Sequence, residues 1–182
     1  MENKEVNKKV DYVNSEYQII DDAISVSDFY HIQKEMLNMA SFPWYFQKAI
    51  TFDDDFDPNF IYYMTHVFYD NNLPYSDYFS ILEPILKVIN PFTIHRIKAN
   101  FYPNQNMFYE HKMHFDNRST LGAIFYLNDN NGYTKLKLNN GDHIKIESIE
   151  NRLLLFDSRE EHCSTNCTDD FGRFNINFNF FY

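Results

Sequence analysis

The chain has 182 residues, of which 16 are Lys or Arg and 26 are Asp or Glu, so its formal net charge is −10. This acidic balance argues against nucleic acid as a partner, because a nucleic-acid backbone is itself negatively charged. Aromatic residues make up 19% of the chain, which favours β-strands and a bulky core.

The length suggests one domain, or one domain with a terminal extension. Residues 1–15 are polar and contain no apolar signal-peptide segment, and nowhere do 18 apolar residues run together. We therefore expect a loose polar N-terminal tail over 1–15, a cytoplasmic location and no membrane partner. Cys163 and Cys167 are separated by three residues, with no second pair, so we interpret them as reduced thiols rather than zinc ligands.

Two helices and one strand are predicted before residue 92. A helix over 28–39, with Ser27 as its N-cap, is indicated by apolar residues at helical spacing: Phe29, Ile32, Met36, Leu37 and Ala40. The stretch 59–69 is dense in aromatic and β-branched residues and is predicted to be a strand. A second helix is predicted over 76–90, with Pro84 placed to kink its first turns and Pro91 ending it.

Helical spacing disappears after residue 92. Turn signals at 128–132 and 139–142 separate short strands, which we predict over 93–102, 121–128, 134–138, 142–148, 151–157 and 173–182. Many short strands with close turns are typical of an all-β sandwich or barrel. We expect a mainly β protein with N-terminal helices, in which a helix-and-strand cap over 16–92 packs on a β core over 93–182 as one domain overall.

The last predicted strand has two different faces. One face carries Phe174, Ile176, Phe178 and Phe180, and the other carries Arg173, Asn175, Asn177 and Asn179. We expect the apolar face to pack against the core. The polar face either meets solvent or lines a wet pocket inside a barrel, and the sequence leaves both possibilities open.

A candidate metal site lies in the stretch YEHKMHFD, residues 109–116. In a regular strand His114 and Asp116 point the same way, whereas His111 points to the opposite face and is expected at the surface or in a supporting position. A third ligand must come from another strand, and His162 is the best candidate because it follows a strongly apolar strand in a polar loop. Two histidines and one carboxylate cover one face of iron(II) and leave positions open for a cosubstrate and oxygen.

Arg173 adds a second element to this pattern. It lies eleven residues after His162, on the polar face of the last predicted strand. A guanidinium can bind a carboxylate through two parallel hydrogen bonds, which a lysine does less well. The residue is therefore either an exposed cation or the binding group for a dicarboxylate cosubstrate. The other histidines outside this pattern, His31, His66 and His95, are interpreted as helix-surface or strand residues.

Four ordered segments between residues 93 and 182 resemble the 2-oxoglutarate and iron(II)-dependent dioxygenases of the prolyl-4-hydroxylase-like branch. ANFYPNQNMFYEHKMHFD resembles the strand with a Tyr-Pro pair that leads into H-x-D, and AIFYLND resembles the I-Y-Y-L-N strand of that branch. NRLLLFDSREEHCS resembles its segment with the distal histidine, and RFNINF resembles its final strand with an arginine. The bias towards Asn, Ile, Phe and Tyr also resembles small hydroxylase-like proteins of phages with AT-rich genomes, which would place the protein in a host cytoplasm.

This resemblance implies a double-stranded β-helix (jelly-roll) core and an enzyme that hydroxylates a C–H bond while converting 2-oxoglutarate to succinate and CO2. It implies Fe(II) at His114, Asp116 and His162, and 2-oxoglutarate, O2 and accessory ascorbate as small-molecule partners. In the cosubstrate site it implies Arg173, Tyr126, Tyr102 and Asn177. The substrate it suggests is a prolyl residue of a peptide or protein, while a free amino acid or other small molecule stays open.

The chain departs from the resembled pattern at two places. Residues 104–113 replace a shorter Gly-rich turn, and Asn131-Gly132 stands where a Gly-Gly pair usually opens the next hairpin. Two other classes also stay open. One is a cupin-like metalloenzyme of different chemistry, for which His143 would be the additional histidine, and the other is a noncatalytic jelly-roll module for binding or structure.

Overall fold

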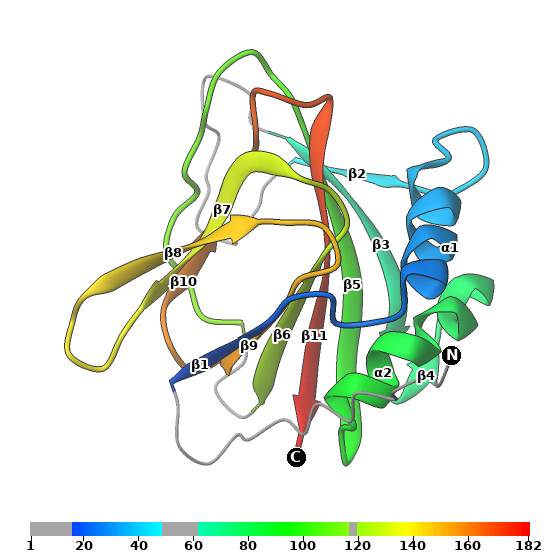
Figure 1. Cartoon of the computed structure of the whole chain (residues 1–182), viewed down its shortest axis with the longest axis horizontal. Helices are drawn as coiled ribbons and strands as arrows, with labels where there is room; N and C mark the ends of the chain where they lie inside the picture. Colours follow the sequence, from blue (N-terminus) through cyan, green and yellow to red (C-terminus); the bar gives the residue numbers. More distant parts are fainter. Residues whose placement is uncertain (1–15, 49–61, 117–119) are drawn as a thin grey trace, which may run out of the picture.

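The computed structural model describes residues 16–48, 62–116 and 120–182. Its strands form two antiparallel sheets (Figure 1). The large sheet contains β1 (Tyr17–Ile20), β2 (Tyr45–Gln47), β3 (Tyr63–Asp70), β4 (Leu73–Pro74), β5 (Thr93–Pro103), β6 (Leu121–Tyr126), β9 (Leu153–Asp157) and β11 (Gly172–Phe181). Their order is β1-β9-β6-β11-β5-β3-β2, and β4 pairs with β3. The small sheet contains β7 (Asn130–Lys137), β8 (His143–Ser148) and β10 (His162–Ser164), in the order β10-β7-β8.

The chain passes repeatedly between these sheets. From β5 in the large sheet it reaches the segment 110–114, which lies beside β10 through the isolated bridges Glu110–Thr165 and His114–His162. It returns to the large sheet in β6, crosses to β7 and β8, and then visits β9, β10 and β11 in turn. This path makes a double-stranded β-helix and confirms the predicted jelly-roll core.

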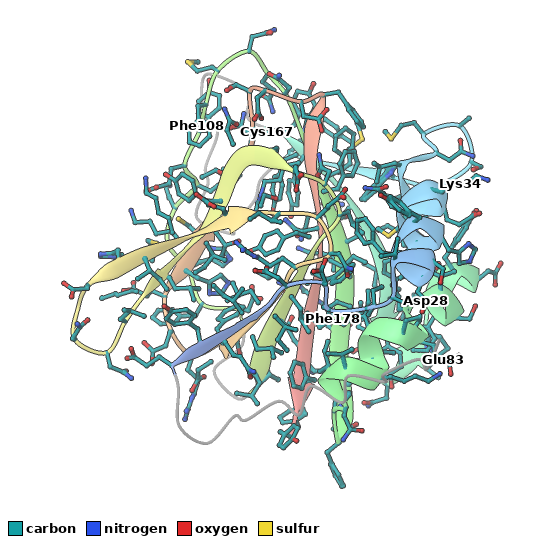
Figure 2. All side chains as sticks on the ribbon, viewed as in Figure 1. Asp28, Lys34, Glu83, Phe108, Cys167 and Phe178 are labelled. Carbon is teal, nitrogen blue, oxygen red and sulfur yellow. The ribbon has the colours of Figure 1, made fainter. Side chains whose placement is uncertain are left out.

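Three helical segments cover the outer face of the large sheet: α1 (Val26–Leu37), the 3-10 helix η1 (Asp77–Leu82) and α2 (Glu83–Ile89). Lys34 on α1 and Glu83 on α2 are exposed and point away from the sheet (Figure 2). Between helices and sheet lies the larger apolar core, which includes Phe29, Ile32, Met36, Leu82, Ile85, Ile89, Phe174, Ile176, Phe178 and Phe180. The helices therefore bury one face of the sheet and leave its other face towards the small sheet.

A second apolar cluster lies between the two sheets. Its buried members are Ile124, Tyr126, Leu136, Ile146, Leu154 and Phe156. They come from β6, β7, β8 and β9, so this cluster fills one half of the space between the sheets. The other half, over β5 and β11, carries the polar face that the sequence identified.

The predicted helices are present with corrected ends. The N-cap of α1 is Ser25, whose Oγ accepts from the Asp28 backbone N–H at 3.2 Å, and not Ser27. The predicted second helix is divided, since the 3-10 helix precedes α2. Pro84 lies in the first turn of α2, where its missing N–H breaks no helical hydrogen bond, so it causes no kink there.

Most predicted strands agree with the observed strands to within two residues. The described part of the 59–69 prediction begins at residue 62, and β3 starts at Tyr63. Gly141, with φ of 87°, forms the predicted turn at 139–142. The predicted turn at 128–132 is wrong in part, because β7 already begins at Asn130. The short strands β1, β2, β4 and β10 were not predicted.

Residues from both sides of position 92 contribute to the large sheet. β1 pairs with β9, and β3 pairs with β5. The division into a cap over 16–92 and a core over 93–182 stays a prediction, and the predicted tail over 1–15 lies outside the described residues. Within the described residues, no helix has the length and hydropathy needed to cross a membrane.

Candidate metal centre

A short antiparallel bridge brings the two predicted histidine ligands together. The backbone N–H of His114 donates to the His162 carbonyl at 2.9 Å, and the His162 N–H donates to the His114 carbonyl at 3.0 Å. Asn166 fixes the start of the same segment, because its Oδ1 accepts from the Tyr109 N–H at 2.8 Å. The imidazole rings consequently lie side by side, with centroids 4.7 Å apart.

Both histidines present the same ring nitrogen to the site. His114 Nδ1 lies 3.2 Å from the carbonyl of Lys112, and His162 Nδ1 lies 3.1 Å from the carbonyl of Glu160. A carbonyl only accepts, so each contact assigns the hydrogen of a neutral ring to Nδ1 and leaves Nε2 as the ligating atom. Backbone contacts of this kind orient metal-binding histidines.

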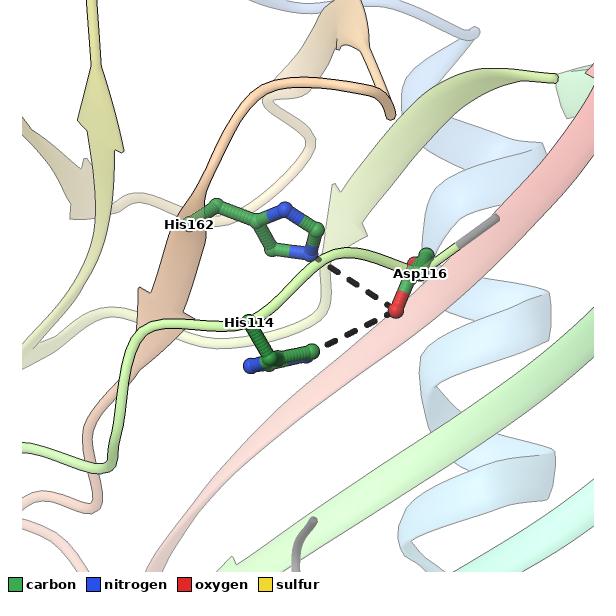
Figure 3. A group of neighbouring side chains, drawn as sticks. All are labelled: His114, Asp116 and His162. Carbon is green, nitrogen blue, oxygen red and sulfur yellow. Dashed lines mark ion pairs between the residues drawn. The ribbon is translucent and has the colours of Figure 1, made fainter. Parts of the chain in front are cut away.

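Asp116 faces both Nε2 atoms through a single oxygen. Its Oδ1 lies 3.5 Å from His114 Nε2 and 3.7 Å from His162 Nε2 (Figure 3). Its Oδ2 accepts from the amides of Asn177 at 2.7 Å and Asn179 at 3.1 Å, both on β11. The two asparagines thereby direct Oδ1 towards the histidines.

The three side chains form an arrangement that favours a bound cation. Their ligating atoms all lie within 4.8 Å of one another. Unprotonated Nε2 lone pairs and a carboxylate repel one another unless a proton or metal ion lies between them. Burial lowers the pKa of His114, but the hydrogen bond and charge of Asp116 outweigh it and raise that pKa overall. Burial likewise opposes ionisation of Asp116, yet His114, His162 and Asn177 hold its pKa well below the usual range.

Arg173 is fully buried on the polar face of β11, which also carries Asn177 and Asn179. Its Nη1 donates to the Thr165 carbonyl at 3.1 Å and its Nη2 to Thr134 Oγ1 at 3.0 Å. Its Nε has no hydrogen-bond partner. Among the described residues, no carboxylate lies within ion-pair distance of this guanidinium. A buried cation without a counter-charge is costly, so the site is suited to an anionic ligand.

Tyr126 and Tyr102 enclose the guanidinium. The ring centroid of Tyr126 lies 5.5 Å from Arg173 Cζ, and that of Tyr102 lies 5.7 Å away. Tyr126 Oη donates to Thr134 Oγ1 at 2.8 Å, so the Thr134 hydroxyl accepts from both Tyr126 and Arg173. Its own hydrogen is then free to be donated to an anion. Burial raises the pKa values of both tyrosines, which keeps their hydroxyls protonated at neutral pH.

Gly132 permits the close approach of Arg173 to the hairpin that opens β7. A Cβ at this position would lie 2.6 Å from Arg173 Cδ and 2.6 Å from the Asn166 carbonyl oxygen. Only glycine fits without moving the arginine. The single glycine of the Asn131-Gly132 pair therefore retains a steric role.

A small cavity lies at the centre of this arrangement. Its lining comprises Asn100, Tyr102, His114, Ile124, Thr134, His162, Cys163, Ser164, Asn175 and Asn177, and its volume is about 30 Å³. A cavity of about 10–15 Å³ by this measure already holds one water molecule. Thr134 and Tyr102 line this cavity and also contact Arg173, so the cavity lies next to the arginine.

The exposure of β11 decides between the two possibilities for its polar face. Arg173 is 0% exposed, Asn175 3%, Asn177 9% and Asn179 3%. The face therefore lines an interior pocket and does not meet solvent. Of the two positions expected for His111, the structure favours the supporting one, because His111 is only 8% exposed and its Nδ1 lies 2.9 Å from Ser164 Oγ. The segment 109–116 is not a regular strand, so alternation alone could not decide between these two positions.

The structure brings the predicted ligands and Arg173, Tyr126 and Tyr102 to one region. Asn177, predicted for the cosubstrate, lines the cavity and also holds Asp116. His31 and His95 are exposed and His143 lies exposed at the start of β8, while His66 bonds to Pro43 and Ser76. Cys163 and Cys167 are buried and form no disulfide, and burial raises the pKa of each thiol to about 11.

Sequence reasoning missed two residues that shape the site. Asn179 holds Asp116, and Thr134 connects Tyr126 with Arg173. Asn179 belongs to the polar face that the alternation identified, so its position was available but its partner was not. Thr134 carries no signal in the sequence beyond its place in an alternating strand.

Comparisons with known proteins agree with this architecture. No family model and no curated protein matches the chain. Solved structures do match. A prolyl hydroxylase from Trichoplax adhaerens, in complex with a peptide fragment of the hypoxia inducible factor oxygen degradation domain, is 16% identical, with a TM-score of 0.68 over 92% of this chain and 84% of that chain. A prolyl-4-hydroxylase from Pseudomonas putida is 13% identical, with a TM-score of 0.61 over 93% of this chain and 94% of that chain.

A third similar structure is an epimerase of nogalamycin biosynthesis, in complex with Fe3+ and alpha ketoglutarate. It is 10% identical, with a TM-score of 0.65 over 91% of this chain and 78% of that chain. At such low identities the likeness concerns the fold alone. The chain shares the fold of prolyl hydroxylases and other 2-oxoglutarate and iron oxygenases over almost its whole described length.

Proposed function

We propose that the protein is a 2-oxoglutarate- and Fe(II)-dependent dioxygenase that hydroxylates a C–H bond. The observation that carries this proposal is the convergence of His114, Asp116 and His162 beside a buried arginine that forms no ion pair with any described carboxylate. A metal centre alone would fit many reactions. A metal centre next to a built anion site fits a reaction that needs a metal and an anionic cosubstrate together.

The donor set suits Fe(II) in number and kind. Two imidazole nitrogens and one carboxylate oxygen leave further coordination positions open, as non-haem iron oxygenases require. The asparagine contacts to Asp116 Oδ2 favour coordination through Oδ1 alone. The unpartnered Nε of Arg173 and the Thr134 hydroxyl are the donors suited to the distal carboxylate of 2-oxoglutarate.

When bound, iron with 2-oxoglutarate and oxygen would supply the oxidation of a C–H bond, coupled to formation of succinate and CO2. The chain's own residues provide position and exclusion of water. His114 and His162 are held by backbone contacts, and Phe156 packs edge-on against His162 with centroids 4.9 Å apart. Tyr102 and Tyr126 shield the arginine and would strengthen its attraction for a carboxylate by keeping water away.

The proposed substrate is a prolyl residue or another small C–H-bearing group. Support for a prolyl residue comes from the similar fold of two prolyl hydroxylases, one of them solved with a peptide. It also comes from the Tyr-Pro and H-x-D segments of the sequence. A peptide substrate is therefore the first to test.

The test begins with the cosubstrate. The purified protein is incubated with Fe(II), ascorbate, oxygen and 2-oxoglutarate, and succinate is measured with and without a panel of proline-containing peptides. We expect slow succinate formation without a peptide and faster formation with a substrate. Binding of Mn(II), followed by its electron paramagnetic resonance signal, gives a measurement that does not depend on turnover.

Two histidine variants provide the matched control. His114→Ala should abolish both succinate formation and tight Mn(II) binding, whereas His111→Ala should keep Mn(II) binding, because His111 contacts Ser164 and not Asp116. Absence of succinate together with absence of metal-dependent 2-oxoglutarate binding would refute the proposal. Loss of metal binding in His111→Ala but not in His114→Ala would refute the ligand assignment.

A further inference from the structure

Two cations of β5 lie next to the residues that hold Asp116. Arg96 and Lys98 alternate with the core residues Ile97 and Ala99, so their side chains point to the same face as the cavity residue Asn100. In the pairing of β5 with β11, Arg96 is opposite Asn179 and Lys98 is opposite Asn177. Neighbouring strands are about 4.8 Å apart, so both cations flank the candidate metal centre.

Neither cation forms an ion pair with a carboxylate of the described residues, although Lys98 feels the charge of Asp116. Among the described residues, no carboxylate lies within 4.0 Å of Arg96 or Lys98, although the chain carries a net charge of −10. Other cations of the protein do have such partners: Arg152 pairs with Asp21, Arg159 with Asp157, and Lys137 with Glu161. The Lys98 ammonium lies 5.6 Å from the ring centroid of Tyr63 instead.

The proximity of Arg96 to Lys98 is also energetically unfavourable in the protein without a ligand. Both side chains are only partly exposed, and each repels the other. Burial, together with the charge of Arg96, lowers the pKa of Lys98 to about 8, and Asp116 compensates only in part. Two adjacent, partly buried like charges persist at a cost in stability, which an anion bound between them would offset.

Asp116 is not available to serve as that anion. Its Oδ2 already accepts from Asn177 and Asn179, and its Oδ1 faces the two histidines. Arg173 serves a different position, since it is opposite Tyr102 in the same pairing and contacts Thr134 and Thr165. The site face of β5 and β11 therefore offers two separate groups of positive charge.

We propose that Arg96 and Lys98 form a second anion-binding site, which holds a carboxylate or phosphate group of the substrate beside the metal centre. This inference rests on the proposed function, because it takes the His114–Asp116–His162 group as the place of reaction. A neutral prolyl peptide would leave both cations unpaired. A free carboxylate, an acidic flanking residue or a phosphate group would pair with them, so the substrate class is anionic.

The test measures binding of two simple anions to the full-length protein. Inorganic phosphate and acetate are titrated separately into isotope-labelled protein, with and without Zn(II) and 2-oxoglutarate, and the amide signals of residues 96–98 are followed by nuclear magnetic resonance. We expect saturable shifts at these residues. Saturation by phosphate alone identifies a phosphate site, and saturation by both anions, or by acetate alone, identifies a site that accepts a carboxylate.

Variants show whether the two cations are responsible. Arg96→Gln combined with Lys98→Met should weaken anion binding by about tenfold or more, since each charged hydrogen bond contributes about that factor. Arg96→Lys combined with Lys98→Arg should keep it. The matched control, Lys34→Met combined with Lys145→Met, removes two exposed cations from α1 and β8 and should leave binding unchanged.

Three outcomes would overturn the inference: no saturable shift with either anion, equal binding in the double variant without the two charges, or binding that depends on Arg173 alone. The proposed function can fail separately. If phosphate or acetate binds at Arg96 and Lys98 while iron-dependent succinate formation is absent, the anion site stands and the dioxygenase proposal does not. If succinate forms but neither anion binds at Arg96 and Lys98, the dioxygenase proposal stands and the anion site does not.

Discussion

The two faces of β11 are equally buried and chemically opposite. Towards the helices, Phe174, Ile176, Phe178 and Phe180 pack in the larger core. Towards the small sheet, the strand presents Arg173, Asn175, Asn177 and Asn179. Successive residues of β11 thus alternate between two roles. One set stabilises the fold, and the other set forms part of the candidate site.

The two faces differ in how well their buried atoms are matched by contacts within the protein. The apolar face gains free energy from burial at about 25 cal/mol for each Å². Of the four buried side-chain atoms without a hydrogen-bond partner in the described residues, two lie on the polar face, Arg173 Nε and Asn177 Oδ1, and a third, Asn100 Oδ1, lies beside it on β5. Such atoms cost free energy in the protein alone and become useful when a ligand pairs with them. Burial of this face therefore indicates binding rather than stability.

The largest expected effect tests the apolar face. Phe178 is 1% exposed, so Phe178→Ala should lower the free energy of unfolding by about 3–5 kcal/mol, through lost burial and the cavity left behind. Denaturant unfolding followed by circular dichroism measures it. Phe181→Ala is the matched control, because Phe181 belongs to the same strand but is 38% exposed, and its loss should cost less than about 1 kcal/mol. Similar losses in both variants would contradict a division of roles between the faces.

The second effect tests the polar face through its buried cation. Arg173→Leu should weaken 2-oxoglutarate binding by about 3 kcal/mol, since truncating one partner of a buried charge pair typically costs 2–5 kcal/mol. Mn(II) affinity should change little, because Arg173 does not touch His114, Asp116 or His162. Calorimetric titration of each ligand separates the two results.

The same variant sharpens the comparison of the faces. Stability of the ligand-free protein should fall less in Arg173→Leu than in Phe178→Ala, because the substitution also removes a buried charge with an unpaired Nε. A loss in Arg173→Leu as large as that in Phe178→Ala would mean that the arginine mainly supports the fold.

Much of this division could be predicted from the sequence, because it depends on local periodicity. Alternation identified both faces of β11, and residue chemistry identified His114, Asp116, His162 and Arg173 as candidates. The contacts of Asn177 and Asn179 with Asp116 could not be predicted, since they depend on which side chain of a distant segment lies against β11. The exact geometry at Asp116 is likewise a property of the assembled fold.

The errors have similar physical causes. The strands β1, β2, β4 and β10 are two to four residues long, too short for a periodic pattern. β1, β2 and β10 form because distant segments pair with them, and β4 forms a tight hairpin with the end of β3. Alternation could not decide whether His111 is exposed or supports the site, because 109–116 is held by isolated bridges and side-chain contacts rather than by a continuous ladder. Ser25 replaced Ser27 as the N-cap because its hydroxyl reaches the Asp28 N–H.

The third effect tests the support of the candidate metal ligand. Asn179→Ala removes one of the two amides that hold Asp116 Oδ2, so it should lower Mn(II) affinity by about tenfold or more, the usual result of removing an outer hydrogen bond at a metal site. The paired variant Asn175→Ala changes an asparagine of the same face that bonds to Asn100 and not to Asp116. Equal Mn(II) affinity in Asn179→Ala and the unmodified protein would show that Asn177 alone orients the carboxylate.

The smallest effect concerns pH and again separates the two faces. In metal-free protein the pKa of His114 is raised above 6.5, so the folded state binds that proton more tightly than the unfolded state does. The resulting stabilisation is fully present below about pH 6.5 and is lost as the pH rises through the folded-state pKa. Denaturant midpoints at several pH values should show a slight decline over this range in the unmodified protein and in Phe178→Ala, but not in His114→Gln.

Mn(II) should reverse the trend, because the metal competes with the proton for Nε2 and gains affinity as the pH rises. A decline that persisted in His114→Gln would assign the pH dependence to another group and remove this distinction between the faces.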